Sequence, residues 1–267
     1  MLLAIDIGNT NIHIGLARKV SPSPPDSGKN DWANTWRART IAEKMPDEYL
    51  VLMRNYFDED GYTFESISGV VLASVVPTLT GTFVDLSERY LGHTPLVVGP
   101  GVKSGVRILL DSPHEVGADR VVNAAAVCHL YGSPAIVIDF GTATTFDVID
   151  AENNYLGGAI MPGIGLAHDA LVARTAKLPK VDLAPPPSPI GRNTVHAMQS
   201  GLFWGYVSML EGVVARLQAD MGGEPPARVI ATGGLSVLFA QHTDCIEEIA
   251  PYLTLDGLRI IYGMNQP

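Results

Sequence analysis

Two aspartates, each followed closely by a glycine, stand at the same place in two similar stretches of the chain. Residues 2–15 read LLAIDIGNTNIHIG, and residues 135–148 read AIVIDFGTATTFDV. In both, a short apolar run typical of a buried strand ends in Asp-x-Gly, and a second run with alternating polarity follows, which predicts a hairpin. A glycine turn lets backbone N–H groups approach a phosphate, while the carboxylate can meet a metal ion or water. Two such turns facing each other would bind a polyphosphate from both sides.

One such turn is weak evidence, because β-turns use Asp, Gly and Asn for conformational reasons alone. Two copies at the head of successive chain halves carry more weight. The pair resembles the phosphate 1 and phosphate 2 loops of the acetate and sugar kinase, heat-shock chaperone and actin superfamily, whose two ribonuclease-H-like domains close over ATP. The resemblance implies two α/β domains, residues 1–114 and 115–267, each with a mixed five-stranded sheet flanked by helices.

The elements that must position these turns follow the same order in each half: three strands, a helix, a strand and a helix. After the first hairpin we expect a strand at 36–40, a helix at 47–57, a strand at 69–77, a helix at 78–91 capped by Thr78, and a strand at 95–98. Around the second hairpin we expect helices at 117–131, 165–174, 193–218 and 235–241, with strands at 155–160 and 228–234. Residues 20–34, rich in Pro, Ser, Gly and Asn, predict an exposed loop.

Composition excludes several classes of protein. A formal net charge of -10 argues against a nucleic-acid partner, since phosphate backbones are bound by clustered Lys and Arg. Cys128 and Cys245 are too few for a disulfide framework or a zinc site, which suits a reducing cytoplasm. No signal peptide is visible, and the uncharged stretches 121–138 and 193–210 are broken by polar residues, so we expect buried helices and no membrane partner.

Further motifs narrow the resemblance to the type III pantothenate kinase family over nearly the whole chain. They occupy residues 6–11, 117–120, 139–147, 157–163, 191–194 and 232–234. That family transfers the γ-phosphate of ATP to the hydroxymethyl oxygen of pantothenate, the first step of coenzyme A synthesis. The resemblance implies the same reaction here, with 4'-phosphopantothenate as product.

The resemblance also implies a nucleotide site with two kinds of cation. The residues expected at ATP are Asp6, Ile7, Gly8, Asn9, Thr10, Asn11, Ile12, His13 and Thr142. Asp6 would interact with magnesium directly or through water, in line with the preference of Mg²⁺ for a carboxylate, phosphates and several waters. Asp139 would hold a monovalent cation, potassium or ammonium. Residues 232–234, Thr-Gly-Gly, resemble the adenosine loop of the superfamily, although they would also suit a turn into a helix.

The residues expected at pantothenate are Gly117, Ala118, Asp119, Arg120 and Thr194. Asp119 would accept the proton of the substrate hydroxyl, and Arg120 would face a carboxylate or phosphate, which its planar guanidinium binds bidentately. Without the flanking motifs, Asp119 and Arg120 would suit a capped helix terminus with a surface salt bridge. Thr194 alone would suit the start of a long helix.

Two alternative functions remain open at this stage. Another small-molecule kinase of the superfamily would share the phosphate loops, and only residues 117–120 and Thr194 discriminate against it. A non-catalytic regulator is the second alternative, since relatives have been described as accessory factors in transcription, but Asp6, Asp119 and Asp139 are all in place.

Two further expectations concern the second half. His168 and Asp169 are expected as a helix-surface pair rather than a metal site. A homodimer is expected because the family binds pantothenate near a subunit interface and the long helix carries an apolar stripe. The members of the stripe are Met198, Leu202, Phe203, Tyr206, Met209 and Leu210. In the same helix, Gly201 and Gly205 would allow another backbone to approach closely.

Overall fold

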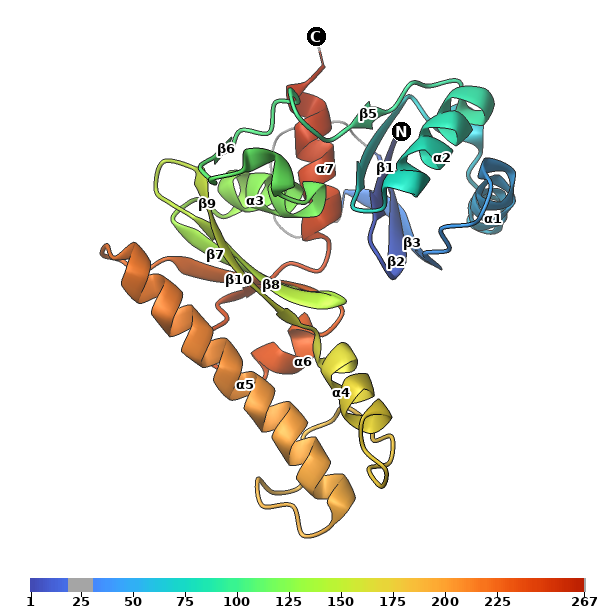
Figure 1. Ribbon diagram of the computed structural model, residues 1–267. Coiled ribbons are helices and arrows are strands. Elements are labelled where there is room, and N and C mark those ends of the chain that lie inside the picture. Colours follow the sequence, from blue (N-terminus) through green and yellow to red (C-terminus); the bar gives the residue numbers. More distant parts are fainter. Residues whose placement is uncertain (19–30, 267) are drawn as a thin grey trace. The chain divides into compact units, whose positions relative to one another are not determined.

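The computed structural model describes residues 1–18 and 31–266, which belong to two compact units (Figure 1). The first unit comprises Met1–Gly132 and Tyr252–Pro267, and the second comprises Ser133–Pro251. This division differs from the predicted boundary between residues 114 and 115. The reason is that α3 (Ala118–Leu130) and α7 (Leu253–Met264) pack together and against the strands of the first unit.

The first unit contains a mixed sheet with the strand order β3-β2-β1-β4-β5. Strands β1 (Leu2–Ile7), β2 (Asn11–Ala17) and β3 (Trp32–Arg39) are antiparallel neighbours. Strands β4 (Gly69–Ser74) and β5 (Leu96–Val97) continue the sheet in parallel with β1. The parallel connection runs through α1 (Pro46–Glu59), and α2 (Pro77–Leu86) connects β4 to β5.

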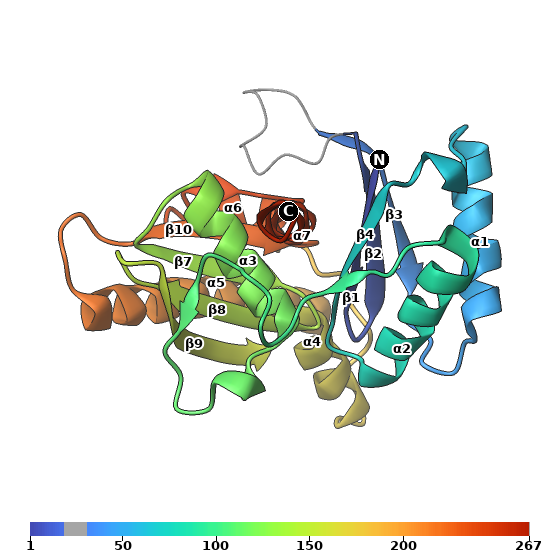
Figure 2. The same cartoon turned by 90° about the horizontal axis from the view of Figure 1, so that it is seen from above.

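The period of two residues in β1 divides its side chains between two apolar layers. Leu3, Ile5 and Ile7 face a core that includes residues of α1 and α2, which lie on one side of the sheet in Figure 2. Leu2 and Ala4 face a second core with residues of α3 and α7. Asp6 therefore projects from the face that α3 and α7 cover.

The second unit repeats this topology, with the strand order β11-β10-β7-β8-β9. Strands β7 (Ala135–Phe140), β8 (Ala143–Ile149) and β9 (Asn154–Pro162) are antiparallel, while β10 (Arg228–Gly233) and β11 (Glu248–Ile249) run parallel to β7. The repeat extends to burial, because β1 and β7 are buried throughout except at their fifth residues, Asp6 and Asp139. The two aspartates thus occupy equivalent positions in equivalent strands.

Three helices described in the second unit complete its core: α4 (Ile164–Ala173), α5 (Thr194–Met221) and α6 (Ser236–Ala240). Helix α5, the long orange helix of Figure 1, buries Phe203, Tyr206 and Leu210 against strands β7, β8 and β10. The side chain of Asn193 caps its N-terminus by accepting the N–H of His196 at 2.8 Å. The predicted fold class is confirmed, two mixed sheets flanked by helices, although the second sheet has six strands and not the five predicted.

Several predicted boundaries were wrong. Thr78 does not cap α2, which begins with Pro77 after Val76, and Ser87–Leu91 forms a separate π-helical turn. Strand β3 already begins at Trp32, so the predicted loop at 20–34 is wrong for its last residues, while residues 19–30 lie outside the described part. Helix α7 and the two-residue strands β6 (Arg107–Ile108) and β11 were not predicted, and neither were the 3-10 turns Phe64–Ser66 and Pro113–Glu115.

Within residues 1–18 and 31–266, no helix is both long enough and apolar enough to cross a membrane.

Candidate nucleotide and substrate site

The turn after β1 is fixed by hydrogen bonds on both sides. The N–H of Gly8 donates to the carbonyl of Asn11 at 3.0 Å, which closes the turn. Thr40, just after β3, donates its N–H to the carbonyl of Thr10 at 2.9 Å and its hydroxyl to the carbonyl of Gly8 at 2.7 Å. The backbone carbonyls are thus held by the neighbouring strand, and Asp6 lies half-buried immediately before the turn.

Asp6, His13 and Arg37 form a row across three strands. Asp6 of β1 pairs with His13 of β2, and His13 pairs with Arg37 of β3, so all three project from one face of the sheet. Burial, aided by the positive charge of Arg37, lowers the pKa of His13 to about 4. The imidazole is therefore neutral at neutral pH.

Asp119 lies in the first turn of α3, and Gly117 occupies the cap position with extended backbone. One carboxylate oxygen of Asp119 accepts the N–H of Arg120 at 2.9 Å. Burial raises the pKa of Asp119, although Arg120 and backbone hydrogen bonds oppose the shift. A Cβ at Gly117 would lie 2.4 Å from Oδ1 of Asp119, so only glycine leaves this carboxylate in place. The carboxyl group is thus half-buried in the first turn of α3 and makes no side-chain cap of the helix.

The N-terminus of α3 is close to the turn after β1 within the first unit. The N–H of Val75, which follows β4, donates to the carbonyl of Ile7 at 3.0 Å. A Cβ at Gly117 would lie 3.5 Å from Cγ1 of the same valine. Val75 therefore connects the residues just before Gly8 to the residues just before Asp119.

The equivalent turn in the second unit is tighter. The N–H of Gly141 donates to the carbonyl of Ala143 at 3.1 Å, which leaves Thr142 exposed at the tip. From the end of β9, the N–H of Gly163 donates to the carbonyl of Thr142 at 3.0 Å. A Cβ at Gly163 would lie only 2.4 Å from that carbonyl oxygen, so the contact requires glycine.

The Thr-Gly-Gly loop at 232–234 lies beside Asp139. Thr232 of β10 pairs with Asp139 of β7 in the parallel register. Gly233 has a φ of +89°, which favours glycine, and a Cβ there would lie 2.6 Å from the carbonyl of Phe140 and 2.8 Å from Oδ1 of Asp139. The loop expected at adenosine and the carboxylate expected at a monovalent cation are therefore neighbours in the second unit.

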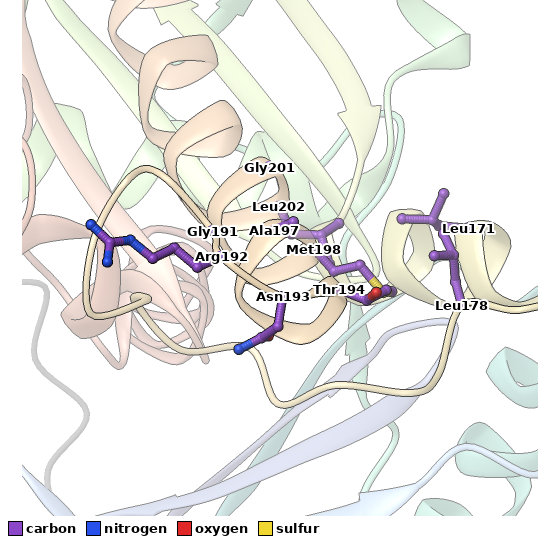
Figure 3. A pocket seen from close by; sticks show the side chains of 10 residues that line it. All are labelled: Leu171, Leu178, Gly191, Arg192, Asn193, Thr194, Ala197, Met198, Gly201 and Leu202. Carbon is purple, nitrogen blue, oxygen red and sulfur yellow. The ribbon is translucent and has the colours of Figure 1, made fainter.

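A pocket of about 710 Å³ opens at the start of α5 (Figure 3). Thr194 is the first residue of the helix, and the pocket continues along Met198 and Leu202. In Figure 3 the side chain of Arg192 points away from Leu171 and Leu178. The remaining lining residues are Gly191, Asn193, Ala197 and Gly201. The pocket is mostly apolar, with the threonine hydroxyl at the capped end of a long helix.

The structure brings the predicted residues together in two groups. The first unit holds residues 6–13 and 117–120, and the second holds Asp139, Thr142 and Thr194. Within the described residues, no three His, Cys, Asp or Glu side chains form a group that would hold a metal ion by themselves.

The prediction for His168 was wrong. Its side chain is 3% exposed, and its Nε2 accepts the N–H of Val181 at 3.2 Å, while Asp169 stays exposed. The histidine thus fastens the segment after α4 to that helix. Sequence reasoning also missed the contact of Gly163 with Thr142, although the glycine-rich turn at 161–165 was the available signal.

The profile of the type III pantothenate kinase family matches residues 2–216. The type III pantothenate kinase of Moorella thermoacetica is 51% identical over 265 residues, which cover 99% of this chain and 100% of that protein.

Two solved structures resemble the fold over nearly the full length. One, from Campylobacter jejuni, is described as a transcriptional activator of the Baf family; it has a TM-score of 0.59, 17% identity and 98% coverage of both chains. Another, described as a 2-dehydro-3-deoxygalactonokinase from Sinorhizobium meliloti, has a TM-score of 0.55 and 11% identity, and covers 100% of this chain and 97% of that chain. At these identities the likeness shows the fold alone.

Proposed function

The chain belongs to the type III pantothenate kinase family, and we propose that it transfers the γ-phosphate of ATP to pantothenate, the first step of coenzyme A biosynthesis. The observation that carries the assignment is the half-buried carboxylate of Asp119 beside the phosphate 1 turn in one unit. A kinase of this kind needs a positioned base next to the group that holds the γ-phosphate.

In this proposal the phosphates of ATP bind at the glycine turns. Residues 6–13 and Thr142 supply backbone N–H groups, a hydroxyl and the amide of Asn9 to phosphate oxygens. Asp6 suits magnesium because its carboxylate stands half-buried next to the turn; the other ligands would be phosphate oxygens and water. When bound, magnesium neutralises charge on the transferring phosphoryl group.

Asp119 orients the hydroxymethyl group of pantothenate and accepts its proton as the new P–O bond forms. Its raised pKa makes the carboxylate a better proton acceptor than an ordinary Asp. Gly117 and Ala118 form the part of the α3 N-terminus that would face pantothenate. Arg120 presents a guanidinium to the carboxylate of pantothenate or to a phosphate.

Asp139 holds a monovalent cation, potassium or ammonium, in this proposal. Its support is the equivalence of Asp139 with Asp6 and the closeness of Gly233, whose missing Cβ leaves room beside the carboxylate. A cation here lowers the cost of placing phosphate oxygens near an acidic residue.

The active form would be a homodimer in which Thr194 contacts pantothenate. The apolar stripe of α5 supports this less than expected, because Met198, Phe203, Tyr206 and Leu210 are buried in the core of their own chain. The remaining support is the family membership, the apolar pocket at Thr194, and the open space beside Gly201 and Gly205, where a Cβ would meet nothing within 4 Å.

We further propose that the protein acts in the cytoplasm, where its free cysteines, Cys128 and Cys245, remain reduced. Residues 1–114 and 115–267 would descend from one repeated ribonuclease-H-like domain, since the strand orders match.

The deciding experiment measures ADP release with pantothenate, a panel of sugars and acetate, with and without potassium, and identifies the product by mass. Phosphopantothenate with ADP in equal amounts is expected. Turnover of a sugar or acetate with none of pantothenate would support the other kinase, and no turnover with any substrate would support the non-catalytic regulator.

A further inference from the structure

A buried tyrosine lies beneath the two loops of the second unit that we assign to ATP. Tyr206 of α5 is 7% exposed, and its ring centroid is 5.0 Å from that of Phe239 in α6. Phe239 in turn stacks on Phe140 at 5.3 Å. Helix α6 follows the loop at 232–234, and Phe140 directly precedes Gly141. The aromatic cluster therefore packs against the chain next to both loops, 141–142 and 232–234.

The hydroxyl of Tyr206 is tied to the segment that follows Thr142. It is hydrogen-bonded to the hydroxyl of Thr144 in β8, which is 1% exposed. Thr144 stands two residues after Thr142. Ile164 at the start of α4 belongs to the same buried cluster as Tyr206, and it directly follows Gly163, whose N–H donates to the carbonyl of Thr142 at 3.0 Å. Tyr206 therefore bonds to β8 through its hydroxyl and shares one core with the start of α4, and these two segments hold Thr142.

We propose that Tyr206 is a positioning residue for phosphoryl transfer: through the hydroxyl of Thr144, its own hydroxyl holds the Thr142 turn in the geometry that binds ATP. This inference rests on the proposed function, because it takes Thr142 as an ATP contact. Thr142 is exposed and its loop has two residues, so its orientation depends on what lies beneath it. A hydrogen bond between two buried hydroxyls supplies a direction that packing alone lacks.

The simplest competing explanation is that Tyr206 only fills the core. Tyr206→Phe separates the two, because phenylalanine keeps the ring contacts and removes the hydroxyl. The KM for ATP is expected to rise by about tenfold, the scale of one lost buried hydrogen bond, with the KM for pantothenate unchanged. An unchanged KM for ATP would overturn the inference.

Tyr155→Phe is the matched control. It removes another buried tyrosine hydroxyl of the second unit, bonded at 2.7 Å to Asp147, away from the Thr142 turn. It should lower the melting temperature and leave the KM for ATP as in the parent. An equal rise in both variants would mean that lost stability causes the effect, which overturns the positioning role.

The partner hydroxyl gives a second test that does not depend on Tyr206→Phe folding well. Thr144→Val should raise the KM for ATP as Tyr206→Phe does, and Thr144→Ser, which keeps the hydroxyl, should restore it. The double variant Tyr206→Phe/Thr144→Val should be no worse than either single one, because both remove one shared bond. Additive effects would show that the two residues act separately and would overturn the proposal.

Amide hydrogen exchange at Gly163 and calorimetric binding of ATP without pantothenate distinguish this inference from the proposed function. If the parent fails to phosphorylate pantothenate but Tyr206→Phe speeds exchange at Gly163 and weakens ATP binding, the proposed function is wrong and the positioning role stands. If the parent is active and Tyr206→Phe changes neither measurement, the positioning role is wrong and the function stands.

Discussion

At the scale of single residues, the proposed base is a carboxylate placed where its charge is unfavourable. Burial raises the pKa of Asp119, and the glycine at 117 lets the carboxylate lie against the backbone before it. Such a group is a stronger base than an exposed aspartate, but its ionised form destabilises the fold. Function and stability are therefore opposed at this one side chain.

Asp119→Asn should abolish phosphoryl transfer, because the amide keeps the shape but accepts no proton. Turnover should fall by about 100-fold or more, the usual scale for a positioned base. Since the pKa is raised in the folded state, the charge costs stability above the ordinary Asp value, so the variant should melt higher than the parent at neutral pH. Steady-state kinetics and calorimetry test both, and turnover within a fewfold of the parent would contradict the role of base.

Asp139→Asn should weaken the use of ATP and blunt the activation by potassium. The reason is that the amide no longer offsets the charge of a monovalent cation. Potassium titrations of the parent and the variant measure this, with Asp150→Asn as control, because Asp150 lies at the far end of the same hairpin, hydrogen-bonded to Asn154. Unchanged potassium dependence in Asp139→Asn would place the cation elsewhere.

At the scale of elements, glycines decide how closely one strand approaches a neighbouring turn. The sequence made the two hairpins predictable, because a carboxylate followed by glycine ends an apolar run in both. It did not reveal that Gly163 touches Thr142, or that His168 is buried, because both depend on how α4 packs after β9. His168 stands beside the polar Asp169, so the sequence suggests an exposed side chain. Its burial depends on the later segment around Val181, which packs over it.

Gly163→Ala should raise the KM for ATP and lower the melting temperature, because its Cβ would lie 2.4 Å from the carbonyl of Thr142 and 2.7 Å from that of Gly141. Gly165→Ala is the control within the same motif. It lies in α4 with nothing within 4 Å of its Cβ, so alanine should stabilise the helix by about 0.5–1 kcal/mol. Equal kinetics for the two variants would contradict the role of Gly163.

Asp256 makes the attachment of α7 depend on pH. It accepts the indole N–H of Trp32 at 3.0 Å, and the buried Arg259 and Asp31, 3.4 Å apart, are its charged neighbours. Burial raises the pKa of Asp256 from 3.8 to about 6, while Trp32 and Arg259 oppose the shift. The contribution of this group to stability is therefore largest below the unfolded value and is lost as the pH rises towards 6.

Asp256→Asn keeps an acceptor for Trp32 and removes the titration. Relative to this variant, the parent should lose on the order of 3 kcal/mol of unfolding free energy between about pH 4 and pH 7. Urea denaturation at several pH values measures the difference. A constant difference across that range would show that Asp256 keeps the ordinary pKa of aspartate.

At the scale of the whole molecule, the repeated strand order was predictable from the sequence. Which of the two units each helix packs in was not predictable. Helix α7 carries Leu255, Leu258 and Ile261 on the face that meets β1 and β4. No local pattern in residues 252–264 indicates that they pack against residues 2–4, because almost the whole sequence separates the two segments. Sequence order alone therefore groups residues 253–264 with the second half, whereas they pack in the first unit.

The protein should be a dimer in solution. Light scattering at micromolar concentration should give twice the chain mass of 28.5 kDa. Gly205→Glu, on the open side of α5, should shift the mass towards the monomer and lower activity, whereas Gly212→Ala, farther along the helix, should not. A fully active monomer would contradict the dimer.

The return of the last helix to the first sheet sets an order of events during synthesis. Leu2 and Ala4 leave the ribosome first, yet Leu255 and Leu258, which cover them, leave after the whole second unit has been made. Residues 133–251 can complete their core while the apolar face of β1 and β4 still has only α3 of the two helices that cover it. The nascent chain thus exposes part of this apolar surface until α7 has been synthesised. Synthesis proceeds at about 5–20 residues per second. A chaperone that binds apolar strands would find its target in the half made first.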